Sequence, residues 1–182
     1  MPNMLARELV WQQAYIALGG NLGDVLATFT QVLRQLSAMD AIRGLRSSSA
    51  FKSLALTQNG YDDQLPAYWN AVCSVETTLS PEDLLHVMQA YEDEAGRLRH
   101  GVWESRTLDL DLLSFAETVQ EERELQLPHP RLAQRGFVLQ PFFEVAADYR
   151  VPGFDRSVRQ LVAEHSDINE GIVEKRENWL TL

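Results

Sequence analysis

The chain has 182 residues, of which 45% are hydrophobic and 23% are charged, and it carries a formal net charge of −10. This length suits one domain that buries a core without disulfides or a structural metal, while the acidic balance excludes nucleic acid and anionic membranes as bulk partners. The single cysteine excludes an internal disulfide, and no apolar run approaches the ~20 residues that span a bilayer. We therefore expect one cytoplasmic domain over residues 1–182, with an N-terminal tail at 1–13 and a C-terminal tail at 167–182.

The first predicted elements are a strand, a glycine-rich turn and a helix. The apolar run 14–18 predicts a buried strand that ends at Gly19-Gly20. This turn can cradle a phosphate with backbone amides, but it matches neither the P-loop nor the full dinucleotide fingerprint, so ordinary turn chemistry is the simpler interpretation. The following helix has apolar residues at spacings of three and four, which predict a buried stripe. They are Val25, Phe29, Val32, Leu33 and Leu36.

Two further strands are predicted after this helix. Residues 42–53 favour a strand weakly, and residues 54–66 have the composition of a polar loop, a candidate mobile lid. Clear alternation returns at residues 68–77, where Tyr68 and Asn70 face away from the apolar side. A ring and an amide on one face suit a flat heterocycle, and an ordinary half-exposed strand is an equal alternative.

Residues 80–83 (Ser-Pro-Glu-Asp) predict the start of a second helix, with Ser as N-cap and acids in the first turn. Gly96 is placed to end it. Arg97 and Arg99 follow directly, and they suit either an anionic ligand or the negative end of the helix dipole. Trp103 lies in a polar turn, where an exposed tryptophan often covers a ligand.

The stretch 106–113 is the strongest chemical signal in the chain. It alternates, so Thr107, Asp109 and Asp111 share one face of a strand and the leucines share the other. Two carboxylates about 6–7 Å apart on one face repel each other unless a cation lies between them. Mg²⁺ is the natural one, because it takes one or two carboxylates and completes its shell with water and substrate phosphates. The alternative is a half-exposed strand with an acidic face, which the basic residues just upstream disfavour.

The rest of the chain adds a turn and two helices. His129 lies between two prolines, where it is either a ligand contact or a turn residue. Residues 135–143 predict a helix with a proline bend, a short amphipathic helix follows Asp155, and residues 167–182 match no pattern. The order strand–helix–strand–strand–helix–strand predicts an α+β fold with a ferredoxin-like, antiparallel-rich sheet flanked by helices in α/β/α layers.

In their order along the chain, these motifs resemble the hydroxymethyl-dihydropterin pyrophosphokinase family over about residues 15–146. Each motif is weak alone, whereas the ordered set is specific. The motifs are residues 15–23, 68–72, 79–85, 96–99, 106–111, 129–131 and 135–139. The resemblance implies an enzyme that moves the β,γ-pyrophosphoryl group of ATP to the hydroxymethyl group of 6-hydroxymethyl-7,8-dihydropterin, releasing AMP, in folate biosynthesis.

The resemblance also implies a set of site residues. By role they are Asp109 and Asp111 for two Mg²⁺ ions; Tyr68, Asn70, Trp103 and Phe137 for the pterin; Gln89, Glu92, Arg99, His129 and Arg135 for ATP; and Arg97 and Arg106 for catalysis. The implied partners are ATP and the pterin, with neither nucleic acid nor membrane, and a monomer is expected.

The chain departs from the family pattern in its loops. Gly20 stands where the family usually has Ser, and Ser105 where Pro commonly precedes the arginine. Residues 51–66 lack the usual proline-rich loop, and the link over residues 97–106 is shorter. Two alternatives follow from these changes: a catalytically weak paralogue that binds pterin or nucleotide, or another Mg-dependent nucleotidyl- or phosphotransferase. Asn70 with its flanking aromatics disfavours the second.

Overall fold

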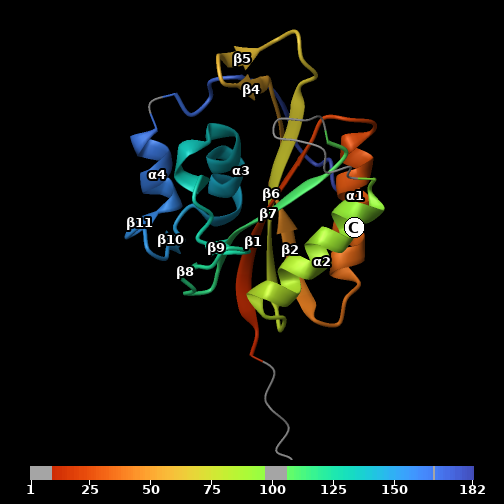
Figure 1. Cartoon of the computed structure of the whole chain (residues 1–182), viewed down its shortest axis with the longest axis vertical. Helices are drawn as coiled ribbons and strands as arrows, with labels where there is room; N and C mark the ends of the chain where they lie inside the picture. The colour runs from red at the N-terminus through yellow and green to blue at the C-terminus, as the bar shows by residue number, and fades with distance from the viewer. Residues whose placement is uncertain (1–9, 97–105, 166) are drawn as a thin grey trace, which may run out of the picture.

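The structure is a computed structural model that describes residues 10–96, 106–165 and 167–182. Among these residues, an antiparallel sheet of six strands lies between two layers of helices (Figure 1). Its strands are β1 (Gln12–Gly20), β2 (Ile42–Ser47), β3 (Ala50–Ser53), β6 (Tyr68–Thr77), β7 (Asp109–Phe115) and β12 (Ile172–Arg176). Helices α1 (Val25–Ser37) and α2 (Pro81–Glu94) cover one face, and α3 (Gly136–Ala146) and α4 (Val158–Glu164) cover the other.

The strand order confirms the ferredoxin-like arrangement. The order is β12–β3–β6–β1–β7, and β2 also pairs with β6. β1 is central and runs antiparallel to both of its neighbours, β6 and β7. The weakly predicted strand at 42–53 is divided into β2 and β3. The strand is interrupted at Ser48, whose side-chain hydroxyl accepts a hydrogen bond from Val72 N at 3.0 Å.

The central strands contribute to two hydrophobic cores. On β1, Ile16 packs beneath α1 and α2, and its neighbour Tyr15 packs beneath α3 and α4, as the alternation of a strand requires. Cys73 lies in the first core, where burial raises the pKa of its thiol to about 12. The stripe predicted for the first helix is buried in full: Val25, Phe29, Val32, Leu33 and Leu36.

The helix ends follow from local sequence. The Ser80 side chain accepts a hydrogen bond from Asp83 N at 3.0 Å and caps α2, with Pro81 in the first turn. Gly96 follows the last turn of α2 with φ +80°, a conformation that favours glycine. Pro141 lies inside α3, as the predicted proline bend required.

The segment 54–66 was predicted to be loop throughout, and that prediction is wrong. It contains a hairpin of β4 (Ala55–Thr57) and β5 (Gly60–Asp62). Strands of three residues are too short to show a period, so sequence pattern does not reveal them. Other short elements are β8 (Gln120–Glu121), β9 (Gln126–Leu127), β10 (Arg150–Val151), β11 (Arg156–Ser157) and the 3₁₀ turn η1 (Leu132–Gln134).

Both terminal segments contribute to the sheet. β1 begins at Gln12, inside the expected N-terminal tail, and β12 pairs with β3. After β12, the Trp179 indole donates to Ser48 O at 2.8 Å, and its ring meets Phe29 edge-on at 5.9 Å. None of the helices within the described ranges is long and apolar enough to cross a bilayer.

Candidate active site

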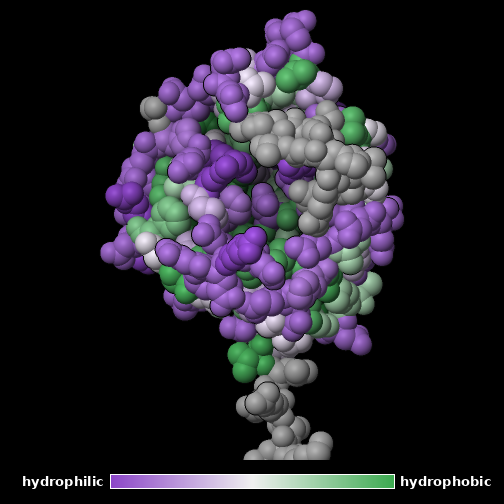
Figure 2. Space-filling view, in the orientation of Figure 1, coloured by the Kyte–Doolittle hydropathy of each residue, from purple (hydrophilic) through white to green (hydrophobic). Residues whose placement is uncertain are grey.

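A cleft of about 530 Å³ lies on the α3 side of the sheet, where α3, the β4–β5 hairpin and the start of β7 meet. Figure 2 shows this face hollowed near its centre, with hydrophilic side chains around the opening. The cleft gathers residues that are far apart in the sequence. From the predicted set it brings together Tyr68, Asn70, Arg106, Asp109, Asp111, Arg135 and Phe137.

The sheet register sets the floor of the cleft. Gly19 of β1 pairs with Asn70 of β6 on one side and with Asp109 of β7 on the other. A side chain at position 19 would contact both, since its Cβ would lie 3.7 Å from Asn70 Oδ1 and 3.9 Å from Asp109 Cβ. Because the position is glycine, the amide and the carboxylate flank an open strip of backbone.

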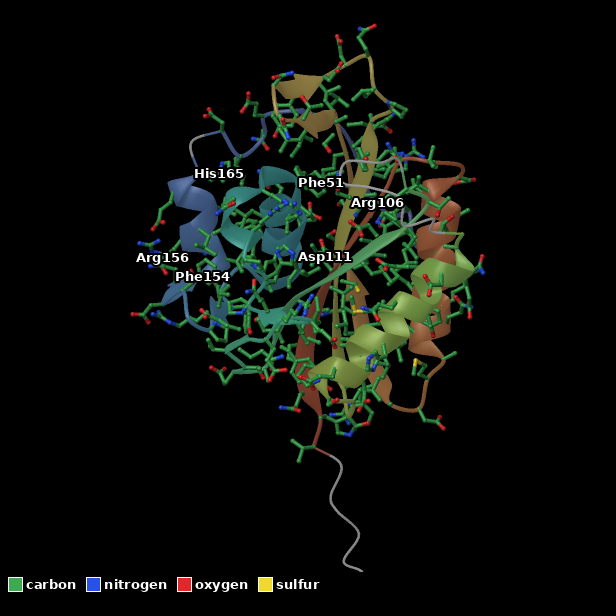
Figure 3. All side chains as sticks on the ribbon, in the orientation of Figure 1. Phe51, Arg106, Asp111, Phe154, Arg156 and His165 are labelled. Carbon is green, nitrogen blue, oxygen red and sulfur yellow. The ribbon has the colours of Figure 1, made fainter. Side chains whose placement is uncertain are left out.

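The two aspartates concentrate negative charge at one wall. Burial raises the pKa of the Asp111 carboxyl, the Asp109 carboxylate raises it further, and His129 and Arg135 oppose the shift. Arg106 Nη1 donates to Asp109 Oδ2 at 2.6 Å. Figure 3 shows Asp111 between the sheet and α3, with Arg106 nearer the start of β7. A cation between the carboxylates would relieve their mutual repulsion.

Thr107 does not share the face of the aspartates, so that part of the prediction is wrong. β7 begins only at Asp109, and the Thr107 hydroxyl donates to Ala95 O at the end of α2, at 2.7 Å. Thr107 therefore joins β7 to α2 on the side away from the cleft.

The turn after β1 forms hydrogen bonds with the backbone of Arg106. Asn21 N and Leu22 N donate to Arg106 O at 2.8 and 3.1 Å, and Arg106 N donates to Asn21 Oδ1 at 2.7 Å. Gly20 permits this approach, because a Cβ there would lie 2.7 Å from Thr107 O. We call this contact between Asn21 and Arg106 the arginine clamp. Sequence reasoning missed Asn21, although the glycine-rich turn pointed to its position.

Three of the predicted pterin residues, Tyr68, Asn70 and Phe137, line one part of the cleft. Tyr68 and Phe137 lie on its walls, and the Arg135 guanidinium lies 5.8 Å from the centre of the Phe137 ring. Asn70 is buried, and its Nδ2 donates to Ser53 Oγ at 2.9 Å. That bond fixes which way the amide points. Ser53 was not predicted, and no motif signals it.

His129 lies beside Asp111, with Nε2 3.9 Å from Asp111 Oδ2. Its Nδ1 accepts a hydrogen bond from Arg131 N at 3.2 Å. Burial lowers the pKa of His129, and Asp111 opposes that shift. Because Nδ1 accepts from Arg131 N, Nε2 is the nitrogen that can carry a proton, and it is the one nearer the Asp111 carboxylate.

Two predicted ATP contacts lie on α2, on the other side of the sheet from the cleft. Gln89 is half-buried on α2, which covers the other face of the sheet. Glu92 is buried behind β7, and its Oε1 accepts a hydrogen bond from Leu110 N at 2.7 Å. The structure thus places Glu92 behind the strand that carries the aspartates. Arg97, Arg99 and Trp103 lie outside the described residues.

The donor set fits a hard divalent cation that shares its shell with substrate. Within the described ranges, no three His, Cys, Asp or Glu side chains gather as a metal site. Asp109 and Asp111 offer carboxylate oxygens beside an open cleft, and Mg²⁺ commonly takes one or two carboxylates together with phosphate oxygens and water.

Comparison with protein families gives a match over most of the chain. Residues 15–147 match the model of the family described as 7,8-dihydro-6-hydroxymethylpterin-pyrophosphokinase (HPPK). Proteins named 2-amino-4-hydroxy-6-hydroxymethyldihydropteridine pyrophosphokinase are similar in sequence. The one from Haemophilus influenzae is 38% identical over 154 residues, 85% of this chain and 93% of the relative. The one from Pseudomonas aeruginosa is 38% identical over 152 residues, 84% of this chain and 91% of the relative.

Solved structures show the same fold at lower identity. A Plasmodium falciparum HPPK-DHPS triple mutant superposes with a TM-score of 0.68 at 13% identity, over 92% of this chain and 47% of that one. Wild-type HPPK-DHPS from the same organism gives a TM-score of 0.66 at 12% identity, over 87% of this chain and 45% of that one. The chain therefore spans about half the length of these two-part proteins.

Proposed function

The chain belongs to the 7,8-dihydro-6-hydroxymethylpterin-pyrophosphokinase family, and on that premise we propose that its reaction takes place in the cleft of Asp109 and Asp111. The enzyme transfers a pyrophosphoryl group to hydroxymethyldihydropterin in folate biosynthesis and draws it from ATP. One observation carries the proposal: the strand register places Asn70 and Asp109 on either side of Gly19, with no side chain between them. The Asn70 amide, suited to a heterocycle, therefore lies close to the Asp109 carboxylate, suited to a metal ion.

Asp109 and Asp111 would hold two Mg²⁺ ions together with the ATP phosphates. Mg²⁺ supplies charge neutralisation and orientation of the phosphates when it is bound. The pKa of the Asp111 carboxyl is raised first by burial and then by the Asp109 carboxylate, and a cation held by both side chains would favour their charged forms.

Arginines provide the remaining positive charge. The Arg106 guanidinium, already directed at Asp109, would contact the transferred group. Arg135, on the cleft wall before α3, and His129, beside Asp111, would contact ATP. Arg97 and Arg99 are proposed to act with them. Transfer of this kind depends mostly on positioning and electrostatic stabilisation, so the residues near the cleft suffice without a strong general base.

Tyr68 and Phe137 would enclose the pterin ring while Asn70 hydrogen-bonds its edge. The bond from Asn70 Nδ2 to Ser53 supports this role, because it leaves the amide in one orientation for recognition. Trp103 is proposed to close over the ring. We further propose that the enzyme acts as a monomer, since one chain supplies every group named here, and that it works in the cytoplasm, where a free thiol such as Cys73 stays reduced.

The metal assignment is tested with Asp109→Asn and Asp111→Asn. Each change keeps the size of the side chain and removes one negative charge, so we expect kcat to fall by on the order of 100-fold or more. The unfolding transition should not change, since both side chains face the cleft. Asp40→Asn, at an exposed turn, is the matched control. An unaltered rate in either cleft variant would remove the aspartates from the metal site.

A further inference from the structure

Two separate parts of the chain form facing walls of the cleft. One is the start of α3, which contributes Arg135, Phe137 and Val138. The other is the segment 53–57, which runs from the end of β3 into β4 and includes Ser53, the partner of Asn70. α3 packs on β3 and β6, but the second wall continues past the end of β3 into the β4–β5 hairpin, so the position of that part of the wall depends on further contacts.

Residues 167–171, which we call the strap, contact both walls. Figure 1 shows this blue segment running from the end of α4 to the β4–β5 hairpin. On the α3 side, Ile168 O packs against Gly136 so closely that no side chain fits at position 136. Gln140 Nε2 also donates to Asn169 Oδ1 at 2.8 Å. The strap is thereby held along the first turns of α3.

The other end of the strap holds the hairpin wall. Leu54 N donates to Gly171 O at 2.8 Å, and Leu54 is the residue directly after Ser53. The Tyr61 ring of β5 lies against Gly171, where a methyl group would overlap it. Gly171 has φ +74°, so both its backbone and its contact with Tyr61 require glycine.

We infer that the strap positions the hairpin wall for pterin binding, which rests on the proposed role of the cleft. It acts through Leu54 and Tyr61 rather than by touching the substrate. Without this anchor, the small hairpin within residues 54–66 would sample several positions relative to α3, and each ligand would have to order it on binding. The strap lies beyond residues 15–147, the part matched by the family, so it is a feature that the family match does not describe.

Gly171→Ala is the most direct test, because the added methyl group would displace Tyr61. We expect KM for the pterin to rise on the order of tenfold, while KM for ATP and kcat at saturation stay within about twofold. Gly153→Ala is the matched control. Gly153 has nearly the same φ, +75°, but a Cβ there would make only ordinary contacts, the nearest at 3.5 Å to Val119.

Tyr61→Ala provides a second route that does not strain the backbone. It should raise KM for the pterin as well, whereas Tyr61→Phe, which keeps the ring, should restore the wild-type value. The double variant Gly171→Ala/Tyr61→Ala should exceed Tyr61→Ala by much less than the full effect of Gly171→Ala, because the methyl group then displaces no ring and only the backbone strain at φ +74° remains. Additive effects, or equal losses in both KM values and kcat, would overturn the inference.

Asn70→Ala, measured in parallel, separates this inference from the proposed function. If Asn70→Ala raises KM for the pterin and neither Gly171→Ala nor Tyr61→Ala does, the strap has no positioning role. If Asn70→Ala leaves KM for the pterin unchanged, the cleft is not the pterin site, and both the assignment and the strap inference fail.

Discussion

At the scale of single residues, the site depends on contacts between groups that are remote in the sequence. The arginine clamp joins Asn21 to Arg106 across 85 positions. Because hydrogen bonds hold both the N–H and the C=O of Arg106, they restrict where its guanidinium can reach. Asn21 Nδ2 also donates to Pro66 O at 3.4 Å, so the same side chain meets the loop that follows the hairpin.

We predict that Asn21→Ala lowers kcat more than it raises KM for ATP. The change removes the acceptor of Arg106 N, and the arginine would then lose its fixed position beside Asp109. A loss on the order of tenfold in kcat is expected, with about 1 kcal/mol lost from the free energy of unfolding. Steady-state kinetics with urea unfolding measure both quantities.

Asn21→Asp is the matched variant, because its carboxylate can still accept the hydrogen bond from Arg106 N. It should retain most of the rate. Equal losses in the Ala and Asp variants would show that the clamp is not the reason for the effect.

Residue-level prediction worked where side chains share one strand. The alternation of β6 and β7 placed Tyr68 with Asn70, and Asp109 with Asp111, on faces that the structure confirms. It failed for Thr107, because the strand begins two residues later and the hydroxyl turns to α2. The alternation pattern could not reveal the roles of Asn21 and Ser53. Their hydrogen-bond partners are distant in the sequence and are brought close only by tertiary packing, which no local pattern indicates.

At the scale of elements, α2 supports the strand that carries the aspartates. β7 lies at the edge of the sheet formed by the described strands, so backbone groups on its outer side need partners from elsewhere. The Glu92 carboxylate accepts a hydrogen bond from one of these groups, the N–H of Leu110, which lies between Asp109 and Asp111 in the sequence. A buried carboxylate on a helix thus holds the start of the strand that carries the two aspartates.

We predict that Glu92→Ala destabilises the protein by roughly 1–3 kcal/mol, the usual cost of leaving a buried amide without its acceptor. It should also lower kcat, because β7 would shift, and leave KM for ATP nearly unchanged. Glu92→Gln keeps an acceptor oxygen and should lose less on both counts. A large rise in KM for ATP without loss of stability would instead make Glu92 the ATP contact that the family resemblance implied.

Long elements were predictable from the sequence and short ones were not. The stripe of α1 and the cap of α2 each depend on residues within a few positions, so a window of the chain contains the whole signal. β4, β5 and β12 have three to five residues each, too few for a period. β12 exists because β3 offers an edge to pair with, and Trp179 then covers Phe29.

At the scale of the whole molecule, a chain with net charge −10 must bind a polyanion. The long-range field disfavours ATP, so local charges have to overcome it. Arg106, Arg131 and Arg135 all line the cleft, and the aspartates beside them suit ATP that arrives with its metal. The fold serves this arrangement by placing Gly19 of β1 between Asn70 and Asp109, which leaves the cleft open from the proposed pterin residues to the proposed metal residues.

The central claim is that this one cleft joins ATP and pterin for pyrophosphoryl transfer. The most direct measurement is analysis of the nucleotides formed when the purified chain is incubated with ATP, Mg²⁺ and 6-hydroxymethyl-7,8-dihydropterin. We predict AMP in equal amount to the pterin consumed, none when the pterin is omitted, and none after the metal is removed with a chelator. Formation of ADP, or pterin binding without any turnover, would contradict the account and favour another phosphotransferase or a catalytically weak paralogue.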